Sequence, residues 1–368
     1  MSLTILHCAD VHLETTFPET RGGAARRKSL GDAFVRIVDE AQRRNADVLT
    51  IGGDLYESER ASPQTFRFIS EQLGRFGKPV YVAPGNHDPF GPGSLLNRSD
   101  LPPNVRVFNE AAWKAYPLAA GVTLWGFGHT PSEPGRPFAA TRFDRGGLQL
   151  ALVHGSDEAR CPPNKRVTAP FTTAEVVASG ASLLLTGHYH GGYVVSQSGR
   201  PVFAYPGSPE PIRFGEGSGH GALAITIDES SIDVRSVPTA RTRLVDLSCD
   251  LTGVAHEHAA FERIMPVLAG CGIDDYVRLR LTGVVADGTR LDRALIEDHF
   301  ATSLGSLEIS DETRSHDYES IAREPTVRGH VVRDLLALSR QDGTDQARIA
   351  EDALRYAVAA FDGAEVAP

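Results

Sequence analysis

The sequence predicts an α/β protein: a four-layer α/β/β/α sandwich, followed by a small α+β domain and a C-terminal helical hairpin. Two patterns predict the sandwich. Over about the first 238 residues, short continuous apolar runs alternate with stretches of helical period, which is typical of parallel strands buried on both faces and of their crossover helices. After residue 190, short strands separated by Gly-rich and Ser-rich turns follow, which favours antiparallel additions.

The opening of the chain has the pattern of a βαβαβ unit. Leu30–Arg44 and Pro63–Phe76 each place apolar residues on one helical face, and parallel strands joined by such helices imply right-handed crossovers. The expected strands of the first part are Thr4–Ala9, Val48–Gly52, Val80–Ala83, Val122–Gly126, Leu148–Val153 and Leu183–Thr186. Shorter strands are expected at Tyr193–Ser196, Val202–Tyr205, Ala222–Ile227 and Ser231–Ser236.

The pattern changes twice more along the chain, so we expect three parts, 1–238, 239–325 and 326–368. The middle part combines strands and helices. Its expected elements are strands at Arg243–Leu247 and Tyr276–Leu281 and helices at Ala259–Ala269 and Asp292–Phe300. The last part predicts two helices, Val327–Leu338 and Gln346–Phe361, each with one apolar stripe. The stripes are Val331, Leu335, Leu338 and Ile349, Ala353, Tyr356, Ala360. Such a terminal hairpin either packs on its own domain or docks on a partner.

Composition argues against several classes of protein. Hydrophobic residues make up 41% of the chain, enough for a packed core, but no apolar run approaches the roughly 20 residues of a membrane helix. The opening MSLTILHCAD lacks the pattern of a secretory signal. The four cysteines are scattered without a CxxC pair, which disfavours a disulfide framework and a thiolate metal site. We therefore expect a cytoplasmic protein.

The charge of the chain is unevenly distributed. The net charge is -10, which weakens a general nucleic-acid-coating role. Residues 1–238 carry 23 Lys and Arg against 24 Asp and Glu, whereas residues 239–368 carry 14 against 23. The acidity therefore lies in the last third. Two divalent cations would make a cleft in the first part locally positive, so a phosphodiester substrate remains compatible with the composition.

Polar motifs follow the predicted strands of the first part. They contain eight candidate functional residues: Asp10, His12, Asp54, Asn86, His87, His154, His188 and His190. Open α/β sheets place their sites beyond the carboxyl ends of the strands, and the D-x-H and H-x-H spacings direct both side chains to one side of an extended chain. Imidazole, carboxylate and amide ligands suit Mn, Fe or Zn better than an all-oxygen Ca or Mg site. Two such cations, bridged by one carboxylate, activate water for attack at phosphorus.

The set of motifs resembles the calcineurin-like metallophosphoesterase superfamily, whose run is D-x-H, G-D, G-N-H-D, a lone His and G-H-x-H. All five occur here in that order, with gaps of 44, 32, 68 and 34 residues between Asp10, Asp54, Asn86, His154 and His188. The resemblance implies that Asp10, His12 and His190 hold one metal and that Asn86, His154 and His188 hold the other. It makes Asp54 the bridge and His87 the residue that protonates the leaving alkoxide or steadies the phosphoryl oxygens, with Asp88 orienting His87.

Further segments resemble the SbcD family of DNA-repair exonucleases, in particular its YhaO-like branch. They are Leu6–Leu13, the run Ala204–Glu210 and the following Phe214-Gly215-Glu216. The resemblance implies a nuclease domain (1–238), a capping domain (239–325) and C-terminal helices (326–368) that dock on an SMC-type ATPase of the SbcC kind. It also implies a homodimer and Mn²⁺ as the expected metal, with Fe, Zn or Mg as alternatives. Some relatives carry a His three residues after the bridging Asp. Here that position is Glu57, an acid that would repel a phosphate.

Two alternatives remain open at this point. The same site would serve a small-molecule phosphoesterase acting on nucleotides or cyclic nucleotides, and the same fold can persist as a non-catalytic scaffold. The basic stretch Arg21–Lys28 either contacts a phosphate backbone or forms a solvated loop and helix start. The remaining histidines are expected to be structural or solvated: His7, His129, His220, His256, His258, His299, His316 and His330.

Overall fold

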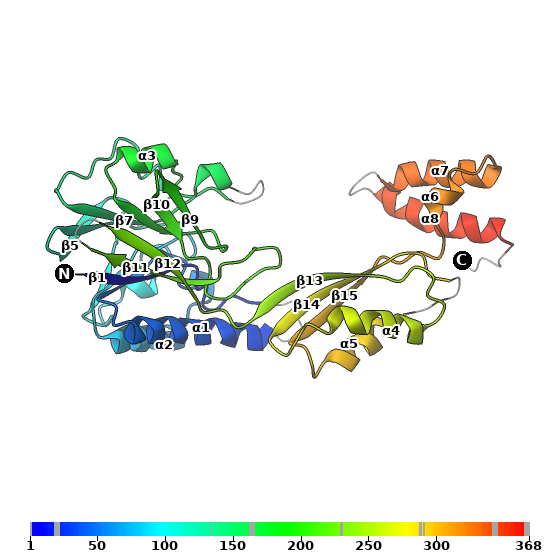
Figure 1. Cartoon of the computed structure of the whole chain (residues 1–368), viewed down its shortest axis with the longest axis horizontal. Coiled ribbons are helices and arrows are strands. Elements are labelled where there is room, and N and C mark those ends of the chain that lie inside the picture. Colours follow the sequence, from blue (N-terminus) through cyan, green and yellow to red (C-terminus); the bar gives the residue numbers. More distant parts are fainter. Residues whose placement is uncertain are drawn as a thin grey trace. The chain divides into compact units, whose positions relative to one another are not determined.

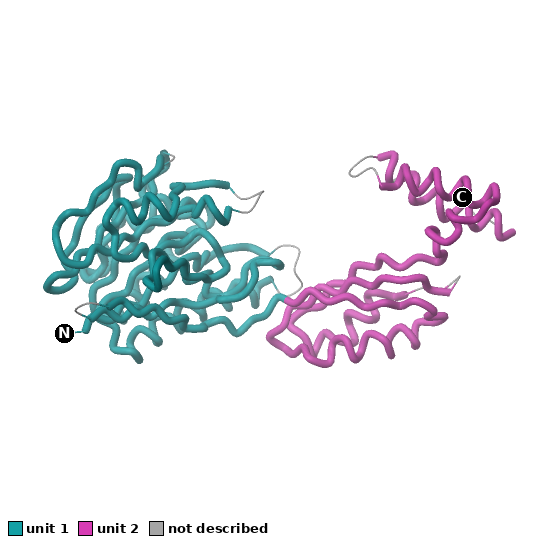
Figure 2. Tube along the Cα trace, turned by 45° about the horizontal axis from the view of Figure 1, so that its top comes forward, with its two compact units in different colours: residues 1–244 teal, residues 245–368 magenta. Residues whose placement is uncertain are grey.

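The computed structural model describes residues 2–363 except 18–22, 133, 162–165, 229–230, 287–288, 290 and 341–344. The chain divides into two compact units, residues 1–244 and residues 245–368 (Figure 2). Unit 1 contains all eight candidate functional residues. No helix among the described residues is long and apolar enough to cross a membrane.

The first sheet of unit 1 has the strand order β12-β11-β1-β2-β3-β4. Its strands are β1 (Leu3–Cys8), β2 (Val48–Ile51), β3 (Val80–Val82), β4 (Val105–Val107), β11 (Gly221–Ile227) and β12 (Ile232–Pro238). The strands β1 to β4 are parallel, and β11 runs antiparallel to β1. The loops that follow β1, β2 and β3 therefore meet at one edge of this sheet.

The second sheet has the order β5-β6-β7-β8-β10-β9. Its strands are β5 (Lys114–Ala119), β6 (Val122–Phe127), β7 (Leu148–His154), β8 (Leu183–Gly187), β9 (Tyr193–Gln197) and β10 (Arg200–Tyr205). The strands β6, β7, β8 and β10 are parallel, and β5 and β9 are antiparallel edge strands. Sequence patterns did not identify β4 or β5, because β4 has three residues and β5 is half-exposed and contains Pro117.

The helices and the two sheets form four layers (Figure 1). The helices α1 (Gly23–Arg43) and α2 (Pro63–Phe76) bury their apolar faces on the outer side of the first sheet, in a core shared by Phe34 and Leu73 with Leu6. A second apolar core fills the space between the sheets. A third covers the outer side of the second sheet, where α3 (Thr173–Ala178) lies. The α/β/β/α sandwich predicted from the sequence is confirmed. Short 3-10 turns occur at Ser58–Arg60, Leu95–Asn97 and Glu158–Arg160.

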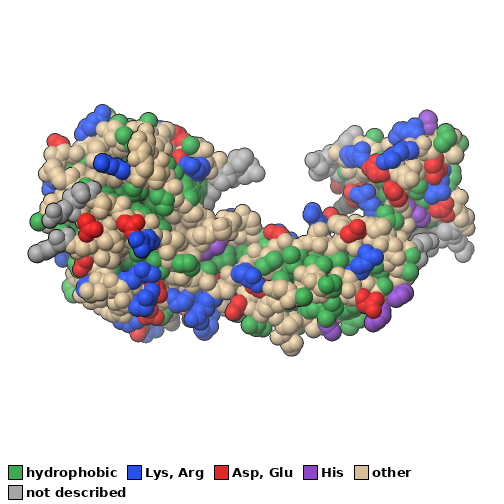
Figure 3. Space-filling view, in the orientation of Figure 1, with side chains coloured by type: hydrophobic (Ala, Val, Ile, Leu, Met, Phe, Trp, Pro, Cys, Tyr) green, Lys and Arg blue, Asp and Glu red, His purple; other side chains and the backbone are tan. Residues whose placement is uncertain are grey.

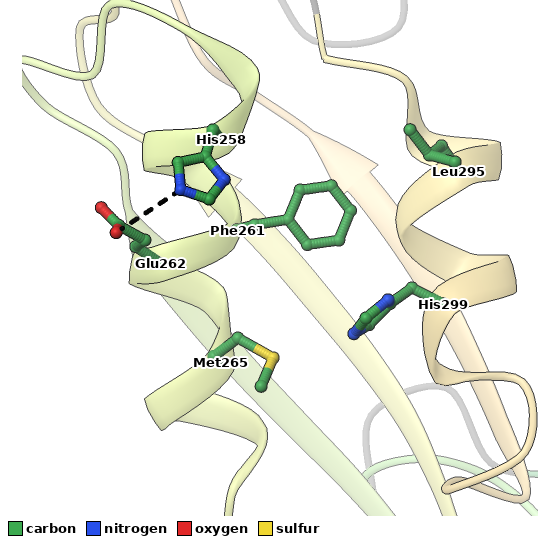
Figure 4. A pocket seen from close by; sticks show the side chains of 6 residues that line it. All are labelled: His258, Phe261, Glu262, Met265, Leu295 and His299. Atoms are coloured by element: carbon green, nitrogen blue, oxygen red, sulfur yellow. Dashed lines mark ion pairs between the residues drawn. The ribbon is translucent and has the colours of Figure 1, made fainter.

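Unit 2 contains a three-stranded sheet covered by two helices, then a helical segment. The sheet has the order β13-β14-β15. Its strands are β13 (Arg243–Asp250), which begins in unit 1, β14 (Asp275–Thr282) and β15 (Ser306–Asp311), and its helices are α4 (Glu257–Leu268) and α5 (Arg293–Phe300). A groove of about 450 Å³ lies between the helices, lined by His258, Phe261, Glu262, Met265, Leu295 and His299 (Figure 4).

The C-terminal helices are α6 (Tyr318–Ile321), α7 (Val327–Ser339) and α8 (Asp345–Phe361). Their shared core contains Val332, Leu336, Leu354 and Val358. The buried face is thus displaced by one residue from the predicted stripes, and Ile349, which we expected in a stripe, is 63% exposed. Apolar residues occur at adjacent positions in both helices, so periodicity alone did not distinguish the two faces. Residues 341–344, which connect α7 to α8, lie outside the described residues.

Candidate metal centre

The eight candidate residues come from both sheets and converge at the carboxyl ends of their strands. Asp10 and His12 follow β1, Asp54 follows β2, and Asn86 and His87 follow β3. The second sheet supplies the others: His154 ends β7, and His188 and His190 follow β8. Residues separated by up to 180 positions in the sequence are therefore brought to one place by the topology of the sandwich.

Three groups of side chains in this region have the spacing of metal sites, and one of them, His12, Glu57 and His87, shares His12 with another. In the first group, Asp10, His12 and His190 each offer a ligand atom, and these atoms lie within 4.8 Å of one another. The second group, with the same spacing, is Asp54, His154 and His188. The amide oxygen of Asn86 lies 3.1 Å from Nε2 of His154 and so adjoins the second group. These are the two ligand sets that the sequence resemblance implies.

Asp54 lies between the two groups. Its Oδ2 is 3.2 Å from Nε2 of His154 in the second group and 3.7 Å from Nε2 of His12 in the first. Its Oδ1 accepts a hydrogen bond from the backbone N–H of His87 at 2.8 Å, which fixes the carboxylate. This is the position that a bridging carboxylate needs.

Several of these residues adopt backbone conformations that side chains rarely take. The φ angles of Asp10, His12 and Asp54 are 54°, 51° and 51°, and that of His188 is 114°. Such positive φ values cost about 1–3 kcal/mol each in non-glycine residues and persist only where the surroundings enforce them. Here they turn the ligand side chains out of their strands and toward one another.

The ligand loops also pack too closely to admit extra side-chain atoms. A Cβ at Gly85 would lie 2.2 Å from Oδ1 of Asp54. A Cβ at Gly187 would lie 2.4 Å from the carbonyl oxygen of Gly52, where the two sheets touch beneath the ligands. Glycine at these two positions allows the two sheets to present their ligands at a common point.

Four histidine rings in the two groups have one nitrogen already hydrogen-bonded. Nδ1 of His12 donates to Glu57, Nδ1 of His190 to Glu216, Nδ1 of His154 to the carbonyl of Gly52 and Nε2 of His188 to the carbonyl of Arg166. A neutral imidazole that donates through one nitrogen keeps a lone pair on the other. In each ring the opposite nitrogen is therefore the one that could bind a metal, although Nε2 of His154 already lies 3.1 Å from Oδ1 of Asn86 and would have to give up a proton first.

One buried atom supports a cation at this site. Nε2 of His12 is buried and has no hydrogen-bond partner among the described residues. It faces Asp54, at 3.7 Å, and Asp10, at 4.0 Å. Buried polar atoms are rarely left without a partner, and a cation between these three side chains would satisfy all of them. The donor set fits divalent transition metals.

The ionisation of the site reflects the proximity of its charges. Burial disfavours a charge on His154, but the carboxylate of Asp54 outweighs this effect and raises the pKa of His154 to about 9. Burial and the neighbouring Asp54 together raise the pKa of Asp88 to about 6. The hydrogen bond to Glu57 raises the pKa of His87. This shift favours the protonated form of His87.

His87 lies at the rim of the site and is paired with a residue that sequence reasoning assigned differently. Its side chain is 40% exposed, and its Nδ1 lies 2.8 Å from Oε2 of Glu57. The carboxylate of Asp88, which we expected to orient His87, instead accepts hydrogen bonds from the backbone N–H groups of Gly85, Asp54 and Leu55. Asp88 thus holds the two ligand loops together, and Glu57 contacts the His87 ring.

Glu57 and Glu216 were not among the predicted site residues. Glu57 was expected to repel a phosphate, but its carboxylate pairs with His12 and His87. Burial alone would raise the pKa of Glu57, but hydrogen bonds and charge interactions with these two histidines lower it. Glu216 lies in a loop after β10 and follows no periodic pattern. The only sequence signal for Glu216 was its place in the Phe214-Gly215-Glu216 segment, which resembles the SbcD family. The predicted basic stretch is divided: Arg26 is buried, Arg27 and Lys28 are exposed, and Arg21 lies outside the described residues.

Comparison with known proteins agrees with this geometry. Residues 3–192, slightly more than half of the chain, match the calcineurin-like phosphoesterase family. The chain belongs to this family. Members of the calcineurin-like phosphoesterase family bind a dimetal centre, and the two clusters described above could hold metal ions.

Among individual relatives, the chain is 27% identical over 249 residues to the uncharacterized metallophosphoesterase YhaO of Bacillus subtilis, a match covering 62% of this chain and 59% of YhaO. It is 26% identical over 236 residues to the DNA double-strand break repair protein Mre11 of Methanopyrus kandleri, covering 58% and 50%. The chain thus spans half to three fifths of these relatives. A dimetal phosphatase from Danio rerio aligns with a TM-score of 0.45 at 13% identity, covering 63% of this chain and 95% of that one.

Proposed function

We propose that this chain is a metal-dependent phosphodiesterase that acts on DNA, as the exonuclease subunit of an SbcCD-like repair complex. The observation that carries the hydrolytic part is the pair of ligand clusters that share Asp54, with His87 at their rim. In this assignment Asp10, His12 and His190 hold one cation, and Asn86, His154 and His188 hold the other. Mn²⁺ is the proposed metal.

The protein's own residues would perform three tasks in this reaction. Bound cations supply the positive charge that activates water and stabilises the oxygens at phosphorus. Asp54 holds the two positions at a fixed separation. His87 donates the proton on its Nε2 to the leaving alkoxide, since its Nδ1 is held by Glu57. Glu57 keeps His87 oriented and favours its protonated form.

The extension to DNA rests on the relatives and on unit 2. Mre11 of Methanopyrus kandleri is named as a DNA double-strand break repair protein, and its match covers 58% of this chain. Arg27 and Lys28 are exposed residues of α1 and could contact a phosphate backbone. Lys and Arg side chains also occur elsewhere on the face of unit 1 that Figure 3 shows. We assign residues 239–325 as a cap that helps to position DNA.

We assign residues 326–368 as the segment that docks on an SMC-type ATPase. Five large apolar side chains of α7 and α8 are 40% or more exposed: Val327, Leu338, Ile349, Tyr356 and Phe361. Exposed apolar side chains on neighbouring helices suit a helical partner surface. We further propose a homodimer formed through α1 and α2, by resemblance to the SbcD family.

A nuclease assay tests the proposal. The purified chain, supplied with Mn²⁺, is incubated with linear duplex, hairpin and single-stranded DNA, and in parallel with a simple aryl phosphodiester, nucleotides and cyclic nucleotides. We expect DNA cleavage by the wild type and none by His87→Ala. Hydrolysis of nucleotide or cyclic-nucleotide esters without DNA cleavage would instead establish a small-molecule phosphoesterase. Absence of stoichiometric metal, together with absence of turnover, would identify a scaffold.

A further inference from the structure

The cluster of His12, Glu57 and His87 is distinct from the two ligand sets that share Asp54. Each of its three side chains offers a ligand atom, and these atoms lie within 4.8 Å of one another. The carboxylate of Glu57 lies between the two rings, with Oε1 2.8 Å from Nδ1 of His12 and Oε2 2.8 Å from Nδ1 of His87. The ring centroids are 4.8 Å apart. Two imidazoles and a carboxylate are therefore close enough to bind one ion.

This cluster is more accessible to solvent than the two ligand sets beneath it. The side chain of His87 is 40% exposed and that of Glu57 is 15% exposed. In contrast, the side chains of Asp54 and His154 are 3% and 0% exposed. An ion from solvent can therefore approach Glu57 and His87 without displacing the buried ligands.

The three side chains are held in place by contacts between the loops that follow β1, β2 and β3. The hydroxyl of Thr15 donates to Oε1 of Glu57 at 3.0 Å. The backbone N–H of Glu57 donates to the carbonyl of Leu13 at 2.9 Å, and that of Ser58 donates to the carbonyl of His87 at 3.1 Å. The ligand atoms are thus positioned before an ion arrives, which reduces the cost of ordering them around it.

The donor atoms of the cluster select the class of ion. Two histidines and one glutamate are a common zinc ligand set, and such a set leaves a coordination position for water. Imidazole nitrogens suit Zn²⁺, whereas Mg²⁺ and Ca²⁺ take oxygen ligands, and sites with nitrogen and oxygen donors bind Zn²⁺ more tightly than Mn²⁺. Zn²⁺ is therefore the ion that this cluster suits best.

Protons on the two Nδ1 atoms occupy the place that the ion would take. Both rings donate through Nδ1 to Glu57. Binding of Zn²⁺ replaces these two protons, which pass to water, as is usual when a metal binds protonated ligands. Two protons leave for one dication, so the charge of the cluster does not change. His12 then uses both ring nitrogens as ligands, Nδ1 here and Nε2 toward Asp10 and Asp54.

We propose that His12, Glu57 and His87 form a third cation site that takes Zn²⁺ from solvent and inhibits the protein. Zn²⁺ on Nδ1 of His87 leaves the ring with the Nε2 proton of a neutral imidazole, which is a much weaker acid than an imidazolium. The leaving alkoxide then lacks its proton donor. The binding site stands on the geometry of the cluster, and the inhibition rests on the proposed function, in which His87 is the general acid.

Metal binding at equilibrium tests the site without reference to turnover. The full chain is dialysed against a series of free Zn²⁺ concentrations, and the bound metal per chain is measured by elemental analysis. We expect three equivalents in the wild type and two in Glu57→Gln and in His87→Ala. The matched control is His258→Ala, which removes an exposed histidine 3.7 Å from Glu262 on helix α4 and should keep three equivalents.

The outcomes separate this inference from the proposed function. Two equivalents in the wild type, or three in both Glu57→Gln and His87→Ala, would overturn the third site and leave a two-metal enzyme intact. Loss of the third equivalent in His258→Ala alone would place that ion on α4 and overturn the site as well. Fewer than two equivalents in the wild type would count against both proposals. Circular dichroism identifies a misfolded variant, and the other variant, changed in a different loop, then decides.

Inhibition is measured separately. The wild type, loaded with Mn²⁺, is assayed at rising concentrations of Zn²⁺, and we expect turnover to fall by about 10²- to 10⁴-fold as the third equivalent binds. Glu57→Gln keeps the ligands of the metal pair but lacks the third site, so its turnover, lower at the outset, should not fall further. Equal inhibition of both proteins would show that Zn²⁺ acts by replacing Mn²⁺ in the pair and would overturn the inhibitory role.

Discussion

The carboxylate of Glu57 lies 2.8 Å from Nδ1 of His87 and, through its other oxygen, 2.8 Å from Nδ1 of His12. One side chain thus connects the proposed general acid to a proposed metal ligand. The acid at this position, which in isolation would repel a phosphate, has its charge balanced by two histidines. Its effect on the reaction should therefore be exerted through His87.

Replacing Glu57 by Gln should move the alkaline limb of the activity profile to lower pH. The hydrogen bond to Glu57 raises the pKa of His87, and a general acid works only while protonated, so activity falls as pH rises through that pKa. Without the glutamate charge the fall should begin earlier. The measurement is kcat against pH at saturating Mn²⁺. Glu59→Gln, an exposed neighbour, is the control, and an unshifted alkaline limb in Glu57→Gln would show that Glu57 does not act through His87.

His87→Ala and Asp54→Ala should both inactivate the protein but differ in metal content. Loss of a general acid costs about 10²- to 10⁴-fold in rate. His87 is in neither of the two ligand clusters proposed to hold the metal pair, so the His87→Ala variant should retain nearly normal metal content. Asp54 adjoins both clusters, so its variant should lose metal as well. The measurement is elemental analysis after gel filtration, with the exposed His330→Ala as control. Equal metal loss in both variants would contradict the acid assignment.

Gly85→Ala should disturb the centre although it adds a single methyl group. Its Cβ would lie 2.2 Å from Oδ1 and 2.7 Å from the backbone nitrogen of Asp54, so either the bridge or its loop must move. We expect reduced metal content and activity, measured as above. Gly135→Ala is the matched control, since nothing lies within 4 Å of the added atom there. Normal metal content in Gly85→Ala would mean that the loop relaxes without displacing Asp54.

His7 should make stability depend on pH. It is fully buried, and this burial lowers its pKa to about 4, whereas the unfolded chain should titrate near 6.5. As pH falls from about 6.5 to about 4, the unfolded state takes up the proton first, so the free energy of unfolding should fall by about 3 kcal/mol from this residue. His7→Gln should lack that component. Denaturant unfolding at several pH values measures it, with the exposed His256→Gln as control, and equal pH dependence in wild type and His7→Gln would refute it.

The layers of unit 1 and the convergence of the eight candidate residues could be predicted because both depend on local sequence. Continuous apolar runs such as Leu148–Val153 identify buried parallel strands, and polar residues directly after such strands must lie at one edge of the sheet. Glu57 and Glu216 could not be assigned in the same way. Each contacts a histidine 26 to 45 residues away, and their contacts depend on how two loops fold back, for which no periodicity exists.

The C-terminal helices show a second limit of sequence reasoning. Helical periodicity and the residues that flank each segment predicted that these helices exist and where they begin and end. They did not predict which face is buried, because Val331 and Val332 are adjacent and equally apolar, as are Leu335 and Leu336. Only packing against α8 selects Val332 and Leu336. The exposed apolar positions that remain include Ile349, which lies in the segment that we propose docks on a partner.

Because each position of the proposed metal pair takes ligands from both sheets, a bound cation is also a cross-link. Asp10 and His12 follow a strand of the first sheet, and His190 follows a strand of the second. At the other position Asn86 follows a strand of the first sheet, and His154, 3.1 Å away, ends a strand of the second. A bound cation would therefore link the two sheets at this end of unit 1. By mass action, ligands that bind only the folded state stabilise it. The ligands that hold the metals for the reaction should thus also stabilise the fold, and a chelator should lower the free energy of unfolding of unit 1.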